Sequence, residues 1–217
     1  MSYYPVFLEL QGKTALVVGG GKVALRKVET LIECGAFVHL VSRELTDRLR
    51  EWVDAGRVRL LGEAFREEHL DGVFLVFVAT NDGDLNRKVS ESAQGLGLLV
   101  NVADEPAHCN FIVPSMVTRG DLLLAISTSG KSPALARKIR EELEVRFGPE
   151  YKTFLTLMGW LREEVLSLGL PQEENSRIFH EIVDSPVLEV FSKGDREQVN
   201  AILARILPKD WNVEFRW

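Results

Sequence analysis

Short apolar runs alternate with stretches of helical periodicity along the first hundred residues. Thr14–Val18 is a run of small and β-branched residues that three glycines close, and it predicts a buried strand. Between residues 24 and 32 the apolar positions recur as on one face of a helix, and Gly35 stands where a C-terminal cap is expected. Phe37–Val41 is a second apolar run. Together these segments predict a strand–helix–strand unit.

The alternation continues through the next sixty or so residues. The further predicted elements are, in chain order, a helix over Leu45–Val53, strands at Val58–Leu61 and Val73–Thr80, a helix over Leu85–Gln94 and a strand at Leu98–Val102. Strands that alternate with helices favour a mostly parallel sheet with helices on both faces. The predicted fold class is therefore α/β, with a Rossmann-type, doubly wound sheet.

The pattern changes after this sheet. Phe111–Val113 and Leu122–Ser127 predict two more strands, which should leave the main sheet because no crossover helix separates them. A helix is then expected to begin at Pro133 with Ser132 as its N-cap and to stop at Gly148. Helical patterns dominate the remainder of the chain.

Three parts follow from this order of elements. They are a nucleotide-binding domain over residues 1–113, a segment over residues 114–148 and a helical domain over residues 149–217. A chain of 217 residues is long enough to bury a substantial core in this arrangement.

Composition narrows the class of protein. Hydrophobic residues make up 46% of the chain and charged residues 27%, as in ordinary globular proteins. A net charge of −6 argues against general binding to nucleic acid, which needs a basic surface. Cys34 and Cys109 lie far apart and belong to no paired-cysteine motif, which fits a reducing cytosol. With neither a signal-peptide pattern nor a run of about 18 apolar residues, a cytoplasmic protein outside the membrane is expected.

A glycine-rich turn joins the first strand to the first helix. Gly19–Ala24 reads GGGKVA and fits the pattern G-x-G-x-x-A. Glycines at such a turn let the backbone approach a pyrophosphate, and the free N–H groups at the helix start point at it. The place between a strand and a helix favours a dinucleotide site over a purely structural turn. The candidate cofactor residues in this turn are Gly19, Gly21, Lys22 and Val23.

The end of the second strand lacks the acidic residue that commonly holds the adenine ribose. Ser42 and Arg43 stand there, followed by Glu44. An arginine at this point leans toward NADP, whose extra phosphate it accommodates. A solvated loop residue and a side chain stacked on adenine are equally compatible with Arg43, so the motif alone leaves the cofactor open.

Polar residues follow two later strands, where the carboxyl edge of the sheet would bring them to the cofactor. Thr80 and Asn81 are placed to contact ribose or nicotinamide, although Asn81 is equally suited to cap the next helix. Asp104 is placed to act as a general base, although the pattern alone slightly favours a turn or N-cap aspartate. His108 and Cys109 lack further ligands at useful spacing, so no metal site is predicted. A polar loop residue and a small apolar filler are expected there.

A second anion site is predicted at the start of the later helix. Hydroxyl residues at 127–129 precede Lys131 and Ser132, and Arg137 follows one turn into the helix. Exposed N–H groups and cations at a helix N-terminus attract anions. Capping accounts for Ser132 but leaves the hydroxyl residues before it unexplained.

Four stretches together resemble one known family. They are YPVFLELQGKTALVVGGGKVALRKVETLIECGA from residue 4, VFVATNDGDLNRKV from residue 76, NVADEPAHCNFIVPS from residue 101 and ISTSGKSPALARKIREELE from residue 126. Their order and spacing are similar to those of precorrin-2 dehydrogenases, a family that includes the N-terminal module of sirohaem synthases and stand-alone dehydrogenase/ferrochelatases. The resemblance covers residues 3–147 and, more loosely, the helical tail.

The resemblance implies an activity. Family members transfer a hydride from precorrin-2 to NAD, giving sirohydrochlorin, and some then insert Fe²⁺ to form sirohaem. They use NAD without the usual acidic residue and contact the ribose through the loop that matches Arg43 and Glu44, so NAD is the expected cofactor. The family's proposed catalytic aspartate matches Asp104. Ferrochelatase activity, and the tetrapyrrole pathway that the product enters, stay open.

The resemblance also implies a homodimer. Its interface would be formed by the segment that matches residues 114–148, and residues 150–207 would help to enclose the tetrapyrrole. The residues expected to receive the substrate are Ser129, Lys131, Ser132, Arg137 and His108. A serine that is phosphorylated in sirohaem synthases aligns with Thr128 or Ser129. Because the chain ends at Trp217 without a methyltransferase domain, methylation of the precursor is expected elsewhere.

A different class of function stays open beside the enzyme. A regulatory module that binds NAD without turnover would share the glycine turn. Residues 101–115 favour the enzyme, because a sensor needs no carboxylate in the cofactor cleft.

Overall fold

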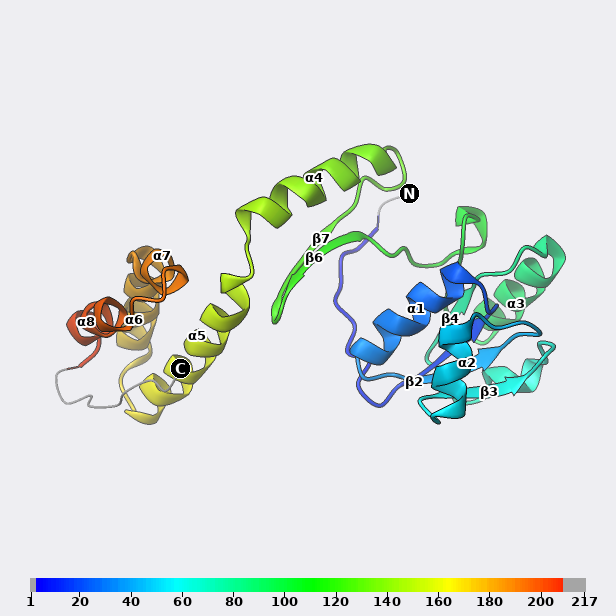
Figure 1. Cartoon of the computed structure of the whole chain (residues 1–217), viewed down its shortest axis with the longest axis horizontal. Coiled ribbons are helices and arrows are strands. Elements are labelled where there is room, and N and C mark those ends of the chain that lie inside the picture. The colour runs from blue at the N-terminus through cyan, green and yellow to red at the C-terminus, as the bar shows by residue number, and fades with distance from the viewer. Residues whose placement is uncertain (1–2, 209–217) are drawn as a thin grey trace. The chain divides into compact units, whose positions relative to one another are not determined.

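The computed structural model describes residues 3–208. The chain divides into two compact units, one reaching Val113 and the other beginning at Pro114 (Figure 1). Each unit has a core of its own. The finer division at residue 148 stays a prediction, and residues 209–217 of the predicted helical domain lie outside the described part.

Five parallel strands form the sheet of the first unit, in the order β3-β2-β1-β4-β5. Their bounds are β1 Thr14–Val18, β2 Phe37–Val41, β3 Val58–Gly62, β4 Leu75–Val78 and β5 Leu99–Val102. The connections hold helices α1 (Lys22–Glu33), α2 (Asp47–Asp54) and α3 (Gly83–Gly95) and the 3₁₀ turns η1 (Glu67–Leu70) and η2 (Pro106–His108). This is the Rossmann strand order, so the predicted α/β fold class is confirmed.

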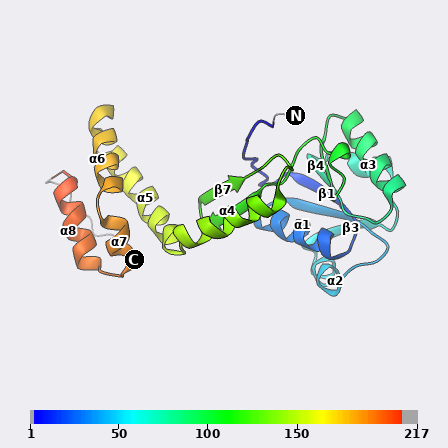
Figure 2. The ribbon, with the colours of Figure 1, turned by 90° about the horizontal axis from the view of Figure 1, so that it is seen from above.

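Helices cover both faces of the sheet (Figure 2). Along β1 the side chains alternate, because Ala15 and Val17 pack with α1 and α2 while Leu16 and Val18 pack with α3. All four are buried. A strand buried on both faces needs a continuous apolar run, which is why β1 shows no polar alternation.

The second unit begins with a hairpin. Strand β6 (Ser115–Arg119) pairs antiparallel with β7 (Leu122–Ile126) outside the main sheet, as expected. The prediction of a strand at Phe111–Val113 is wrong. The Phe111 ring instead packs edge-on against Phe77 of the main sheet, with 5.6 Å between the ring centroids. This contact holds the segment against the first core, and the first hairpin strand starts after it.

Helices make up the rest of the second unit. They are α4 (Pro133–Arg146), α5 (Glu150–Ser167), α6 (Gln172–Asp184), α7 (Val187–Ser192) and α8 (Arg196–Ile206). The last four share one apolar core, centred on fully buried residues such as Leu157, Leu161, Ile178 and Ile182. No helix in residues 3–208 is long and apolar enough to cross a membrane.

Candidate cofactor and catalytic site

The three glycines after β1 are needed for different reasons. Gly19 has a φ of 118°, and a Cβ there would lie 2.3 Å from the carbonyl oxygen of Ala79, just beyond β4. A Cβ on Gly20 would lie 2.0 Å from the carbonyl oxygen of Glu44. A Cβ on Gly21 would meet no atom within 4 Å. Packing within the chain therefore requires the first two glycines, whereas the open space at Gly21 suits the approach of a ligand.

The N-terminus of α1 beside this space is not satisfied by side chains. Gly21 is its N-cap, no side chain accepts the N–H groups of its first turn, and that turn holds no acidic residue. Lys22 is exposed, Val23 is half-buried, and Ala24 is fully buried where the helix meets the sheet. Free donors and the positive end of the helix dipole favour a pyrophosphate at this place. The residues present therefore fit a dinucleotide cofactor.

The loop after β2 is tied to the glycine turn. The N–H of Thr46 donates to the carbonyl oxygen of Gly20 at 3.0 Å. Ser42 donates its hydroxyl to the carbonyl oxygen of Glu44 at 2.7 Å. Arg43 and Glu44 are exposed. Ser42 is thus used in shaping the loop, and the side chains of Arg43 and Glu44 stand free to meet a ligand.

The loop after β4 uses most of its polar groups internally. Thr80 donates its hydroxyl to Asn86 Oδ1 at 2.6 Å and accepts the N–H of Asp82 at 3.1 Å. Asp82 is the N-cap of α3, because its Oδ1 accepts two N–H groups of the first helical turn at 3.1 and 3.0 Å. The alternative of Asn81 as the helix cap is therefore wrong. Asn81 is exposed next to Thr80.

Asp104 lies just beyond β5, at the carboxyl edge of the sheet that also carries the glycine turn. Its φ of 61° places it in the left-handed region. The N–H of Ala103 donates to the carbonyl oxygen of Val78 at 2.8 Å, which holds the backbone before Asp104 against the end of β4. The Asp104 side chain is exposed. Non-glycine residues in this region are uncommon and gather at functional sites.

His108 and Cys109 close the loop that Asp104 begins. The Cys109 thiol accepts the N–H of Val102 at 3.1 Å and lies 3.3 and 3.4 Å from the carbonyl oxygens of Val102 and Glu105. Burial raises the pKa of this thiol, which keeps it protonated as a donor. Cys109 is therefore a hydrogen-bonding anchor as well as the small filler expected. The Nε2 atom of His108 lies 3.7 Å from Glu105 Oε2.

Sequence reasoning missed the polar residues of α3 that hold this loop. Asn86 and Ser90 are only 2% and 0% exposed, although both are polar. Gln94 continues the same row one turn later. Their spacing of four residues places all three on one helix face. Polar residues in a row on the side of a helix that should meet the sheet are the sequence signal that could have identified them.

The start of α4, in the second unit, is capped by its own side chains. Ser132 accepts the N–H of Leu135 at 3.2 Å, and Thr128 Oγ1 accepts the N–H of Ser132 at 3.1 Å. Ser127 accepts the N–H of Ser129 at 3.0 Å, and Ser129 has a φ of 53°. The hydroxyl residues before the helix thus build the turn that leads into it.

Glutamates on α4 pair with most of its early cations. Arg137 Nε donates to Glu141 Oε1 at 2.9 Å, and this bond raises the pKa of Arg137. Lys138 Nζ lies 3.9 Å from Glu142 Oε1. Lys131 is exposed and has no ion pair within the described range 3–208. Exposed pairs of this kind are weak, so a carboxylate ligand can replace the glutamate.

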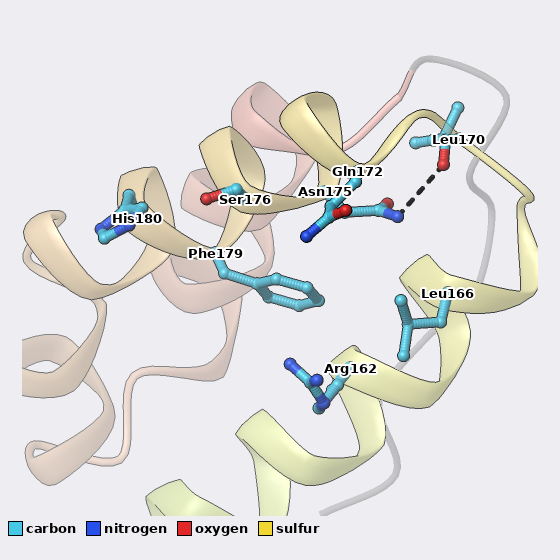
Figure 3. A pocket seen from close by; sticks show the side chains of 8 residues that line it. All are labelled: Arg162, Leu166, Leu170, Gln172, Asn175, Ser176, Phe179 and His180. Atoms are coloured by element: carbon cyan, nitrogen blue, oxygen red, sulfur yellow. Dashed lines mark hydrogen bonds between the residues drawn. The ribbon is translucent and has the colours of Figure 1, made fainter.

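A shallow pocket between α5 and α6 is lined by none of the predicted site residues (Figure 3). It is lined by Arg162, Leu166, Leu170, Gln172, Asn175, Ser176, Phe179 and His180. Arg162 lies over the Phe179 ring, 5.6 Å from its centroid. Asn175 donates to the carbonyl oxygen of Leu170 at 3.2 Å, the dashed line in Figure 3.

Comparison with known families matches both units. Residues 6–115, about half of the chain, match the family described as "Putative NAD(P)-binding". Residues 119–146 match the family described as "Sirohaem biosynthesis protein central".

Two curated relatives are siroheme synthases. That of Photorhabdus laumondii is 44% identical over 165 residues, which are 76% of this chain and 35% of the relative. That of Nitrosococcus oceani is 43% identical over 208 residues, which are 95% of this chain and 44% of the relative. The chain therefore spans less than half the length of either relative.

A solved structure matches over almost the whole chain. The protein described as "SirC, precorrin-2 dehydrogenase" is 29% identical with a TM-score of 0.74, and the match covers 92% of this chain and all of that one. The glycine turn and the open helix start of α1 are features of an NAD(P)-binding protein. Taken with the two family matches and this solved structure, they show that the chain belongs to the precorrin-2 dehydrogenase family.

Proposed function

We propose that this chain oxidises precorrin-2 to sirohydrochlorin with NAD as the hydride acceptor. The observation that carries the proposal is the similarity to SirC, precorrin-2 dehydrogenase, over the full length of that chain. The exposed, left-handed Asp104 supports it, because this reaction has use for a base at the sheet edge that binds the cofactor.

Eight residues are proposed to bind the cofactor. They are Gly19, Gly21, Lys22, Val23, Arg43, Glu44, Thr80 and Asn81. Gly21 and the free N–H groups of α1 would hold the pyrophosphate. Bound NAD supplies the hydride acceptor. Thr80, whose hydroxyl is bonded to Asn86, would act mainly by shaping its loop.

Asp104 is the proposed catalytic base. Oxidation removes one hydride and one proton from precorrin-2, and the hydride leaves with the nicotinamide. The carboxylate of Asp104 would accept the proton released by the macrocycle, a role in which a positioned base contributes about 10²- to 10⁴-fold. His108, later in the same loop, would assist in binding the substrate.

The substrate carries several acetate and propionate groups. Besides His108, the residues proposed to receive them are Ser129, Lys131, Ser132 and Arg137. Lys131 is the strongest of these, because no glutamate on α4 pairs with it, whereas Arg137 must first leave Glu141.

NAD is proposed over NADP. The family uses NAD without an acidic residue at the end of β2, and Ser42 and Arg43 stand there in this chain. Steady-state kinetics with each cofactor should give the higher kcat/KM for NAD. A clear preference for NADP would mean that Arg43 receives the extra phosphate.

The protein is further proposed to be a cytoplasmic homodimer with its interface in residues 114–148. The exposed apolar side chains of this segment, Leu123 on β7 and Leu135 and Val145 on α4, support the proposed interface. Sedimentation equilibrium should give twice the chain mass, and a monomer at micromolar concentration would exclude this interface.

Anaerobic mixing with NAD and precorrin-2 tests the function. We expect NADH fluorescence to rise together with the absorption of sirohydrochlorin. Binding of NAD by calorimetry without NADH formation would instead identify a nucleotide-sensing module. Adding Fe²⁺ to the protein with sirohydrochlorin then decides whether it also inserts iron.

A further inference from the structure

The backbone at Asp104 is held in the left-handed region, which is uncommon for residues that carry a Cβ. A φ of 61° brings a Cβ close to the neighbouring carbonyl oxygen. Such a conformation persists only where the surrounding structure determines it. The loop from Ala103 to Cys109 should therefore contain fixed points on both sides of Asp104.

The fixed point before Asp104 is a main-chain bond and the one after it is a side chain. Ala103 donates its N–H to the carbonyl oxygen of Val78 at 2.8 Å. Glu105 Oε1 accepts from Asn86 Nδ2 at 2.8 Å. Asp104 is the residue between these two attachments.

Three side chains of α3 reach the same loop, and we call Asn86, Ser90 and Gln94 the α3 clamp. Ser90 donates its hydroxyl to the carbonyl oxygen of His108 at 2.6 Å. Gln94 Nε2 lies 3.3 Å from that oxygen and 2.9 Å from Ser90 Oγ. The clamp therefore grips the loop at Glu105 and again at His108.

Asn86 also links the loop to the one after β4. Its Oδ1 accepts the hydroxyl of Thr80 at 2.6 Å, and its Nδ2 donates to the Thr80 carbonyl oxygen at 3.2 Å. Every polar atom of this buried side chain is thus bonded. One amide fixes the loops after β4 and β5 relative to each other.

We propose that Asn86 and Glu105 are positioning residues that hold Asp104 in place for dehydrogenation. Ser90 and Gln94 complete the hold at His108. The expected effect on turnover rests on the proposed function. The restraint of the loop by these side chains does not depend on it. The carboxylate of Glu105 lies beside His108, so the same bond to Asn86 also orders the other polar side chain of the loop.

Hydrogen exchange of the unliganded protein tests the hold directly. Glu105→Ala should speed amide exchange in residues 103–109 by about 10-fold or more, while peptides from β1 and α1 stay unchanged. Asn86→Ala should do the same, and Glu105→Ala remains informative if loss of the buried Asn86 side chain prevents folding. Lys88→Ala, on the exposed face of α3, is the matched control. Unchanged exchange in Glu105→Ala would overturn the proposal.

Turnover tests the consequence. Glu105→Ala should lower kcat by about 10- to 100-fold, as expected for a misplaced reacting group, with the Kd for NAD unchanged. Glu105→Gln should recover most of kcat, because its amide oxygen still accepts from Asn86. Glu91→Gln on the exposed surface of α3 is the charge control.

The double variant Asn86→Ala/Glu105→Ala should be no slower than the slower single variant, because each single change already removes the bond between Asn86 and Glu105. Wild-type kcat in Glu105→Ala, or additive losses in the double variant, would contradict a positioning role. If the wild-type protein does not oxidise precorrin-2 at all, the proposed function fails, and the exchange experiment still decides whether the clamp holds the loop.

Discussion

The starts of α1 and α4 look alike in sequence and differ in structure. Both were predicted to bind anions, because each offers helix N–H groups close to lysine or arginine. At α1, Gly21 supplies no side chain and the first-turn N–H groups stay uncapped. At α4, Ser132 caps the helix and Thr128 accepts the N–H of Ser132.

The difference lies in what remains available to a ligand. Lys22 at α1 and Lys131 at α4 have no ion pair with any residue in the range 3–208, whereas Arg137 at α4 is bonded to Glu141. A glycine N-cap leaves both the donors and the space for an anion, and a serine N-cap uses one of the donors. We therefore expect α1 to be essential for binding the cofactor. We expect α4 to make a smaller contribution to the affinity for the substrate.

Asp104→Asn, in the unit that carries α1, should have the largest effect on the chemical step. The amide keeps the size of the carboxylate and tolerates the left-handed backbone, but it cannot accept the proton. We expect kcat to fall about 10²- to 10⁴-fold with the Kd for NAD unchanged. Stopped-flow NADH fluorescence and calorimetry measure the two quantities. His108→Ala should lower kcat less than Asp104→Asn does. Near-normal turnover in Asp104→Asn would mean that solvent or the substrate itself accepts the proton.

Gly21→Asp should abolish NAD binding in a folded protein. No atom lies within 4 Å of the new Cβ, so the chain should accept it, while the carboxylate would occupy the place of the pyrophosphate. Calorimetry measures the affinity, and circular dichroism measures folding. Gly20→Ala is the contrasting variant, because its Cβ would collide with the Glu44 carbonyl oxygen and should destabilise the fold itself. Normal NAD affinity in folded Gly21→Asp would remove the assigned site.

Ser132→Ala should alter stability at α4 without altering the cofactor site. Loss of the bond to the Leu135 N–H should lower the free energy of unfolding by about 1 kcal/mol, the usual value for an N-cap. Urea denaturation measures this change. The Kd for NAD should stay the same, and a tenfold weaker Kd would mean that α4 takes part in binding NAD.

Arg137→Ala should have the smallest effect. KM for precorrin-2 should rise less than about 10-fold, because the guanidinium already spends part of its binding capacity on an exposed glutamate. Glu141→Gln releases the arginine and should lower KM. Equal changes in KM for precorrin-2 and for NAD would show that α4 does not bind the substrate.

Local sequence signals predicted the elements of the first unit well. The apolar runs became β1 and β2, and the glycine after α1 takes the left-handed conformation expected past a helix end, with a φ of 74° at Gly35. The wrong strand at Phe111–Val113 has a different origin. The segment is apolar, as a strand would be, but the ring of Phe111 packs against Phe77, which is far away in the sequence.

The sequence by itself determined the α/β class, the glycine turn and the capped start of α4, because each depends on residues within a few positions of one another. The tertiary structure decided which helix start keeps its donors free, and that Asp82 rather than Asn81 caps α3. It also decided how the Asp104 loop is held, since Asn86 and Glu105 are 19 residues apart. Their bond depends on the pairing of β4 with β5, which brings both loops to one edge of the sheet and which no local sequence pattern specifies.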